Sequence, residues 1–256
     1  MTDLRGWLAR GPLGSRLRRA RHRARRRFQQ PTERWVRPGS VDFGTLRRLT
    51  PVSSAFGLDR GTGVDRHYIE CFLRDHRNDI HGRVLEVGDD RYTRAFGEGR
   101  VTKSDVLHVD PSARSATITG DLSTGDGLPS DAFDCIVLTQ TLQFVFDLRS
   151  ALANARRALA PGGVLLATVP GISQLSRYDA DRWGEFWRLT AQSAARLAQE
   201  AFGPRAVTVR SFGNVMSAVA LLHGLAAEEL TQAELAALDP DYEVLVAIRA
   251  VKEPLP

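Results

Sequence analysis

A carboxylate and a glycine stand together at the end of a short β-rich run, Arg83-Val84-Leu85-Glu86-Val87-Gly88, and Asp89 and Asp90 follow directly. A carboxylate at the end of a buried strand can bind a cationic or hydroxyl-bearing ligand, and a glycine lets that ligand approach the backbone closely. A dinucleotide would bring a pyrophosphate, which two successive aspartates repel. The segment therefore favours a cationic cofactor, with an ordinary polar turn after a core strand as the alternative.

The elements that must position these groups alternate between strand and helix. Residues 133–139 form an almost continuous apolar run, which is typical of a strand buried on both faces. Apolar residues at helical spacing predict a helix over 148–159, which Pro161-Gly162-Gly163 stops. Further strands are expected at 83–88, 101–109, 116–120, 164–169, 206–210 and 242–251, and further helices from about residue 65, over 181–201, near 215–222 and after Thr231. This order predicts an α/β fold with a doubly wound sheet.

Four segments in register resemble the class I S-adenosylmethionine-dependent methyltransferases, in particular the methyltransferase type 11-like, small-molecule branch. They are Val84-Leu-Glu-Val-Gly88, Gly120-Asp-Leu122, Leu128-Pro-Ser-Asp-Ala-Phe-Asp134 and Leu159-Ala-Pro-Gly-Gly163. The resemblance covers about residues 60–252. It implies a Rossmann-like, mostly parallel sheet of seven strands with the last strand antiparallel, and S-adenosylmethionine as the cofactor.

The resemblance also implies roles for individual residues. Glu86 and Gly88 would lie near the methionine part of the cofactor, beside Asp89. Asp105, 19 residues after Glu86, would hold the ribose hydroxyls, with Asp110 as the second choice. In the remaining motifs, Asp121 would accept the adenine amino group, Leu122 would donate its backbone N–H, and Gln140 and Thr141 would face the transferred methyl group.

The chain departs from the family in its first turn. The usual Gly-x-Gly-x-Gly has Asp90 and Tyr92 at its second and third glycine positions here. Asp tolerates a positive φ better than most residues. A tyrosine does not allow the same close approach of the backbone, which motivates a non-catalytic module as one alternative function.

Methyl transfer to a hydroxyl usually needs a general base, and His223 and His67 are the candidates. Arg66 and Tyr68 stand where a helix could close over the methionine end of the cofactor. The stretch after the fifth strand combines aromatic rings with charged groups, which suits a polyhydroxylated acceptor; we expect Tyr178, Arg182 and Trp183 to contact it. No Cys/His spacing predicts a metal site.

Charge is distributed unevenly along the chain. Residues 1–40 carry 12 Arg and 2 acidic residues, whereas the remainder has a net charge of −5. Eight of the arginines fall in residues 16–27, so this segment is a candidate contact for nucleic acid or for an anionic membrane surface, with a solvated tail as the third possibility. We expect three parts: a flexible basic segment over 1–40, a turn-rich linker over 41–64, and the methyltransferase domain over 65–256.

The composition and the motifs together favour an enzyme. No apolar stretch approaches the roughly 20 residues of a membrane span, no secretory signal is evident, and the two cysteines stand in apolar runs, so a cytoplasmic setting is expected. The favoured function is O-methylation of a small molecule or glycan. The alternatives are a nucleic-acid methyltransferase that uses the basic arm and the non-catalytic module.

Overall fold

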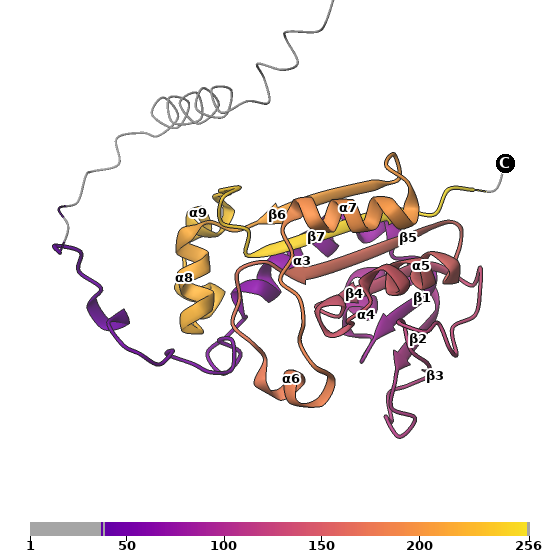
Figure 1. The fold of residues 1–256 in the computed structure, drawn as a ribbon, viewed down its shortest axis with the longest axis horizontal. Helices are drawn as coiled ribbons and strands as arrows, with labels where there is room; N and C mark the ends of the chain where they lie inside the picture. The colour runs from indigo at the N-terminus through magenta and orange to yellow at the C-terminus, as the bar shows by residue number, and fades with distance from the viewer. Residues whose placement is uncertain (1–36, 38, 255–256) are drawn as a thin grey trace, which may run out of the picture. The chain divides into compact units, whose positions relative to one another are not determined.

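The computed structural model describes residue 37 and residues 39–254 (Figure 1). The segment 16–27, for which we predicted a contact with nucleic acid or membrane, lies outside these residues. The chain divides into two compact units, 1–47 and 48–256. In the first unit the described residues form one short 3-10 helix, η1 (Gly44–Leu46), beside which the Arg47 guanidinium lies 5.1 Å from the ring centre of Phe43.

A seven-stranded sheet forms the centre of the second unit, in the order β3-β2-β1-β4-β5-β7-β6 (Figure 1). Its strands are β1 (Gly82–Val87), β2 (Val101–His108), β3 (Ile118–Thr119), β4 (Phe133–Thr139), β5 (Leu159–Pro170), β6 (Val207–Phe212) and β7 (Leu245–Val251). β7 runs antiparallel to both neighbours, β5 and β6, whereas β1 to β5 pair in parallel. The predicted sheet of seven strands with an antiparallel last strand is confirmed.

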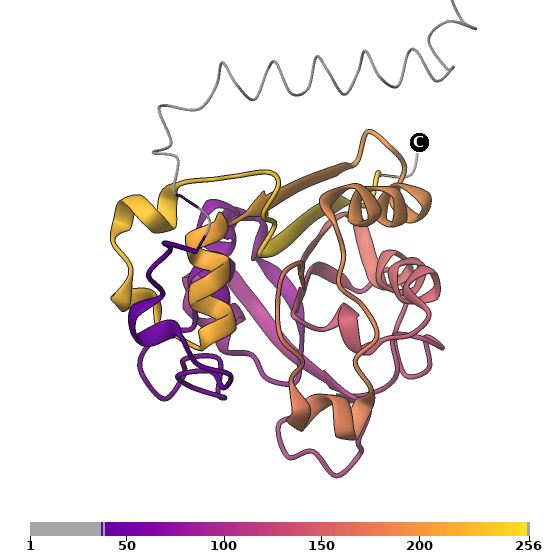
Figure 2. The same cartoon turned by 60° about the vertical axis from the view of Figure 1, so that its left-hand side comes forward.

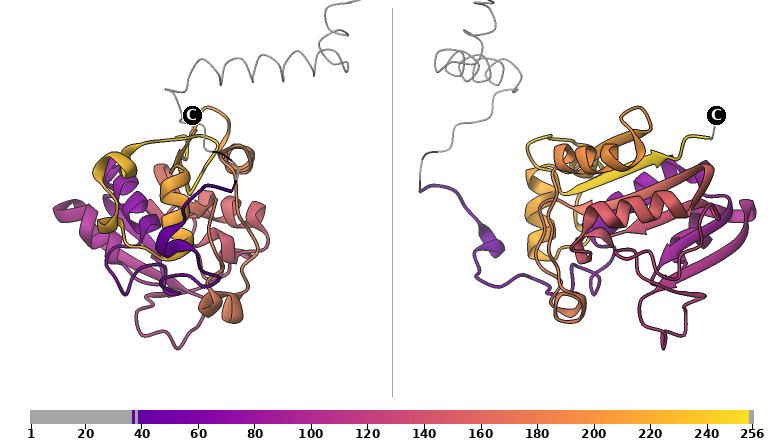
Figure 3. Two further views of the ribbon diagram at one scale, coloured as in Figure 1. Left: turned by 90° about the vertical axis from the view of Figure 1, so that its left-hand side faces the viewer. Right: turned by 45° about the vertical axis from the view of Figure 1, so that its right-hand side comes forward.

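Helices cover both faces of the sheet (Figure 3). The α-helices are α3 (Val64–Asp75), α4 (Arg91–Gly97), α5 (Leu148–Ala158), α6 (Arg177–Trp183), α7 (Ala191–Phe202), α8 (Val215–His223) and α9 (Gln232–Ala236). Short 3-10 helices lie at η2 (Arg77–Asp79), η3 (Glu98–Arg100), η4 (Leu142–Phe144) and η5 (Ala227–Glu229). One apolar core packs α5 and α7 against the sheet, and a second packs α3, α4 and α8 against the opposite face.

The central strand β4 explains why its sequence is continuously apolar. Ile136 and Leu138 belong to the core under α5 and α7, whereas Cys135 and Val137 belong to the core under α3 and α8. Successive side chains of a strand point to opposite faces, so a strand between two helical layers needs apolar residues throughout. Its predicted bounds, 133–139, are those of the structure.

The predicted helix over 181–201 is wrong, because two helices with an extended segment between them occupy this stretch. Gly184, with φ +78°, follows the last residue of α6, and Thr190 caps α7 by accepting a hydrogen bond from the backbone N–H of Ser193. A positive φ at a glycine ends a helix at low cost. α6 lies at one end of the sheet, apart from the helices on its faces (Figure 2).

Among the described residues, no helix has both the length and the apolar character needed to cross a membrane. Both cysteines are free thiols; Cys135 is fully buried, and Cys71 is partly exposed on α3.

Candidate active site

A cavity of about 1150 Å³ lies where five parallel strands end. Its floor consists of residues at or just after the carboxyl ends of β1 to β5, namely Val87, Gly88, Leu107, His108, Gly120, Thr139, Gln140 and Pro170. Ligands of open α/β sheets bind in the crevice outside the carboxyl ends of the strands. The volume exceeds the range of about 300–1000 Å³ that is typical of single-ligand pockets, so a donor and an acceptor fit together.

Gly88 begins the turn that the sequence singled out, and it needs to be a glycine. Its φ is +86°, and a Cβ placed on it would meet no atom within 4 Å, so its backbone faces open space at the cavity wall. The Gly88 N–H donates to the carbonyl of Leu107 at 3.0 Å, which ties the turn to the end of β2. Asp89 also lines the cavity and accepts a bidentate hydrogen bond from Arg91.

Glu86 is buried behind this turn and does not line the cavity. Its carboxylate accepts hydrogen bonds from the backbone N–H groups of Tyr92 (3.3 Å) and Thr93 (2.8 Å) and from the Thr93 hydroxyl (2.8 Å). Burial raises the pKa of Glu86 to about 7, although these hydrogen bonds oppose the shift. The predicted cofactor residue therefore caps the N-terminus of α4, where unpaired N–H groups favour a negative charge, and fixes the turn from behind.

The structure places Asp105 away from the cavity. It lies within β2 and is 2% exposed, and it accepts hydrogen bonds from Arg83 (2.7 Å) and Thr117 (3.0 Å) and an ion pair from Lys103 (3.2 Å). Burial alone would raise the pKa of Asp105, but these hydrogen bonds lower it on balance. Its carboxylate is thus committed to the sheet, and the prediction that it holds the ribose is corrected.

Asp110, the second choice, follows the end of β2, directly after the cavity residues His108 and Val109. It accepts hydrogen bonds from the backbone N–H and the hydroxyl of Ser112, and these lower its pKa. The prediction from the 19-residue interval was wrong because that interval ends inside β2, which continues to His108, and Asp110 is the acidic residue that follows the strand.

Asp121 and Leu122 line the cavity after β3, as the resemblance implied. One oxygen of Asp121, Oδ1, accepts from the N–H and the hydroxyl of Ser123, both at 2.7 Å. Leu122 is 5% exposed, and its carbonyl accepts from the Asn154 side chain of α5 at 2.9 Å. The loop is therefore held in place from within and from the neighbouring helix.

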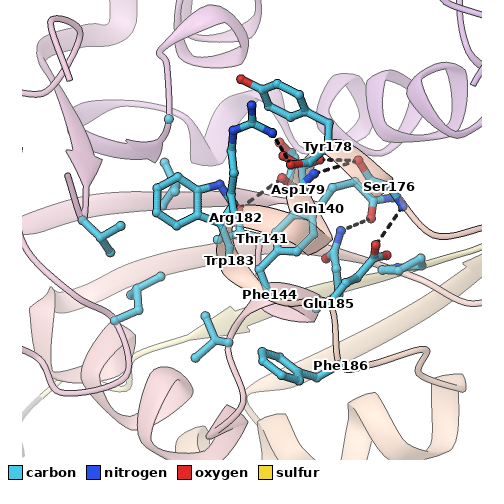
Figure 4. Close-up of a pocket in the computed structure, with 18 of the residues that line it drawn as sticks. Gln140, Thr141, Phe144, Ser176, Tyr178, Asp179, Arg182, Trp183, Glu185 and Phe186 are labelled. Carbon is cyan, nitrogen blue, oxygen red and sulfur yellow. Dashed lines mark hydrogen bonds between the residues drawn. The ribbon is translucent and has the colours of Figure 1, made fainter. Parts of the chain in front are cut away.

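Gln140 stands directly after β4 in a left-handed conformation, with φ +50°. A non-glycine residue in this region costs about 1–3 kcal/mol, and such strain gathers at functional sites. Two contacts hold it there: its N–H donates to the carbonyl of Thr168 on β5, and its side-chain oxygen accepts from Gln143 at 3.0 Å. Gln140 and Thr141 both line the cavity (Figure 4).

Neither residue at the missing glycine positions blocks the cavity. Asp90 has φ −115° and Tyr92 is the second residue of α4, so neither position requires a glycine. The Tyr92 ring is 6% exposed, stacks against Phe96 and does not line the cavity, and its hydroxyl accepts a hydrogen bond from Arg66. The departure from Gly-x-Gly-x-Gly therefore leaves the turn open.

The segment around α6 also lines the cavity (Figure 4). The guanidinium of Arg182 lies 3.5 Å from the ring centre of Tyr178, and the Trp183 ring meets His108 edge to face at 5.9 Å. The hydroxyl of Ser176 donates to Asp179 at 2.6 Å, and its backbone N–H donates to Glu185 at 2.8 Å. All three predicted acceptor residues of this segment line the cavity, as do Asp179 and Glu185, which had no assigned role.

Three predicted residues lie elsewhere. Tyr68 is buried in the core of α3, where its ring stacks on Phe212 and its hydroxyl donates to the carbonyl of Leu235. His67 faces Cys71 on the same helix, and burial lowers its pKa. His223 ends α8, and its carbonyl accepts from Val52 and Ser53. None of the three lines the cavity.

Several other lining residues were not predicted from the sequence. Among residues 39–254, His108 is the one histidine that lines the cavity. Apolar side chains from two distant segments also line it, namely Phe56 and Leu58 before α3 and Phe144 and Phe146 after β4. A histidine at the end of a strand was the available signal. The spacing of the aromatic residues after β4 does not distinguish them from residues of the apolar core.

These residues suit the donor that the resemblance implies. Gly88 offers an open backbone and Asp121 a carboxylate for an amino group, whereas Asp110, the remaining candidate for hydroxyls, follows the lining residues His108 and Val109 without lining the cavity itself. Asp65 and Asp89 line the wall beside Gly88, where a positive group would lie. Among the described residues there is no cluster of His, Cys, Asp and Glu able to hold a metal ion.

Solved structures with a similar fold are methyltransferases and a cyclase. An S-adenosylmethionine-dependent methyltransferase from Archaeoglobus fulgidus is 12% identical, with a TM-score of 0.49 over 73% of this chain and 94% of that one. The N-methyltransferase NodS from Bradyrhizobium japonicum, in complex with S-adenosyl-L-homocysteine, is 18% identical, with a TM-score of 0.47 over 79% of this chain and 94% of that one. The [4+2]-cyclase SpnF is 20% identical, with a TM-score of 0.49 over 77% of this chain and 84% of that one. At these TM-scores the likenesses carry no argument about activity.

No curated protein matches the chain. A family model, described as a methyltransferase domain, matches residues 46–208, which is more than half of the sequence. This span includes the turn at Gly88, the loop at Asp121, the strained Gln140 and the α6 segment. The chain therefore belongs to the methyltransferase domain family and is an S-adenosylmethionine-dependent methyltransferase.

Proposed function

We propose that this enzyme methylates a hydroxyl group of a small molecule or glycan by in-line transfer. The observation that carries the proposal is the composition of the cavity under α6. Exposed aromatic rings, Tyr178, Trp183 and Phe186, stand beside the charged groups Asp179 and Arg182 (Figure 4). Rings stack on the apolar face of a sugar or a similar ring, and charged groups bind its hydroxyls.

Asp179 is the residue best placed to accept the proton of the acceptor hydroxyl. It lines the cavity from the first turn of α6, and the Ser176 hydroxyl donates to its Oδ2. Glu185 lines the same wall, but it is 4% exposed at its side chain and is paired with Arg188 at 2.5 Å. This salt bridge occupies the Glu185 carboxylate, so we assign it to fixing the α6 segment rather than to taking a proton.

His108 is not arranged as a base. Its Nδ1 accepts the backbone N–H of Asp110 at 2.9 Å, so in the neutral ring the proton resides on Nε2. In this tautomer the nitrogen that remains can only donate. The Nε2–H of His108 instead suits an acceptor atom of either substrate, next to the Trp183 ring that it contacts.

Methyl transfer in line needs few chemical groups from the protein. The donor supplies a methyl group on a positively charged sulfur, and this sulfur leaves as a neutral thioether. Holding donor and acceptor in line can lower the barrier by about 7–11 kcal/mol. Gln140 and Thr141 stand between the turn at Gly88 and the α6 segment and would orient the acceptor oxygen. The strained backbone of Gln140 directs this side chain, since an extended residue would point it elsewhere.

Methyl-labelled S-adenosylmethionine tests the proposal. The protein is incubated with it and with panels of glycosides, phenols, amines and oligonucleotides, and label transfer is followed by mass spectrometry. We expect label in hydroxyl-bearing acceptors, as an ether that survives mild alkali. Labelled amines or oligonucleotides alone would contradict O-methylation of a small molecule or glycan.

A pair of α6 variants tests the assignment of the base. Asp179→Asn removes a carboxylate from the cavity, whereas Asp181→Asn removes one that is 62% exposed at its side chain and pairs with Arg177 outside it. Loss of a general base lowers kcat by about 100-fold or more. We expect this for Asp179→Asn and near-native turnover for Asp181→Asn. Equal turnover of the two variants would exclude Asp179 as the base.

A further inference from the structure

The end of the cavity beside Gly88 carries two positive and two negative side chains. Asp65 and Arg66 reach it from the start of α3, and Asp89 and Arg91 from the turn after β1. Asp89 and Arg91 pair with each other, and both are largely exposed. Arg66 is more buried than Arg91 and also lines the cavity. The methionyl group of the donor has one ammonium and one carboxylate, so a wall with both signs of charge complements it.

Arg66 is held in place by Tyr92 rather than by a salt bridge to a carboxylate. Its Nη1 donates to the Tyr92 hydroxyl at 3.2 Å, while its backbone N–H donates to the Asp65 side chain at 2.8 Å. Burial alone would lower the pKa of Arg66, but Asp65 and Tyr92 raise it on balance. The guanidinium has further N–H donors, and its side-chain hydrogen bond is to a neutral hydroxyl, so donors remain for a carboxylate of a ligand while Asp65 offsets part of the positive charge.

Tyr92 is itself rigid. Its ring is 6% exposed, stacks on Phe96 with 6.3 Å between ring centres, and its backbone N–H donates to Glu86. The residue therefore links the cap of α4 to a charged group on the cavity wall. This is also the position at which the family motif has its third glycine, where backbone alone would approach the donor.

We propose that Tyr92 is a positioning residue, which holds the guanidinium of Arg66 against the carboxylate of the donor's methionyl group. A side-chain cation thereby replaces the close backbone approach that a glycine provides. A guanidinium matches a carboxylate through two parallel hydrogen bonds, which gives direction as well as charge. The proposal concerns the donor alone and does not depend on which acceptor is methylated.

Isothermal titration calorimetry of the full chain with two ligands tests this. The ligands are S-adenosyl-L-homocysteine and its decarboxylated analogue, which keeps the adenosyl group, the sulfur and the ammonium. We expect Arg66→Gln to weaken S-adenosyl-L-homocysteine by about 10- to 100-fold. Tyr92→Phe removes only the hydroxyl, and we expect a loss of about 3- to 10-fold. Neither change should alter the affinity of the decarboxylated analogue by more than about twofold.

Two further variants make the outcome decisive. Arg94→Gln removes an exposed arginine from α4, the helix that carries Tyr92. Arg94 pairs with Asp90 and does not line the cavity, so we expect no change in affinity for either ligand. Should Arg66→Gln not fold, Arg66→Lys keeps the charge and loses the two-pronged geometry, with the same selective loss expected. Equal weakening of both ligands, an unchanged Tyr92→Phe variant, or no binding of S-adenosyl-L-homocysteine by the unaltered protein would overturn the proposal.

Discussion

Replacing Asp105 and Asp110 one at a time separates a carboxylate that stabilises the sheet from one that serves the donor. Asp105 accepts hydrogen bonds or ion pairs from three side chains while 2% exposed, whereas the carboxylate of Asp110 accepts hydrogen bonds from Ser112 in the loop after β2. Breaking a buried ion pair typically costs about 3–5 kcal/mol. The Arg83 side chain is 32% exposed, so water compensates part of its loss, and about 2–3 kcal/mol is the expected cost of Asp105→Asn.

The expected results for the two variants are opposite. Asp105→Asn should lower the free energy of unfolding, measured by urea denaturation, and leave the affinity for S-adenosyl-L-homocysteine within about twofold. Asp110→Asn should change stability by less than about 0.5 kcal/mol, as for other surface substitutions. It should weaken the ligand by about 1–3 kcal/mol, because ribose hydroxyls lose a carboxylate. If Asp105→Asn weakens binding more than Asp110→Asn does, the assignment made here is refuted.

Three further changes test the turn and the strand end. Burial raises the pKa of Glu86 to about 7, above its value in the unfolded chain, so its contribution to stability is present below the unfolded pKa and is lost as pH rises through about 7. Relative to Glu86→Gln, the unaltered protein should therefore lose about 3 kcal/mol between about pH 4 and pH 8 in urea titrations; parallel curves would contradict this. Gly88→Val forces a branched residue to φ +86°, so the melting temperature should fall even though the site has room. Gln140→Gly relieves the strain at φ +50° and should retain stability while label transfer falls, and unchanged transfer would show that the side chain plays no part.

The sequence was informative wherever a residue's environment depended on its own strand. The apolar run of β4 predicts a strand buried on both faces, and the structure has the same bounds. The glycine after β1 was recognised because a glycine lets a ligand approach the backbone closely, and the structure gives it a φ of +86°. Both features follow from local conformation and burial, which neighbouring residues in the sequence largely determine.

The failures concern side chains whose partners come from distant segments. Nothing near Asp105 in the sequence shows that Arg83 and Thr117 bind its carboxylate, and nothing near Glu86 shows that it caps the helix six residues later. The histidines were selected mainly by residue type, and in the fold neither His67 nor His223 lines the cavity. Long-range pairing of this kind becomes visible only in the fold.

In the segment that carries α6, hydrogen bonds hold the two ends, which form its base, whereas α6 itself, at its tip, is not buried. Ser176 and Glu185 bind each other across the base, and Arg188 donates to the carbonyl of Gln174 beside them, whereas no residue of α6 is buried. Tilting the tip as a flap would thus break few contacts and expose little new apolar surface, with the base acting as the hinge. Acceptors of different bulk could then enter without unfolding any part of the sheet, and departure of the methylated product need not limit turnover.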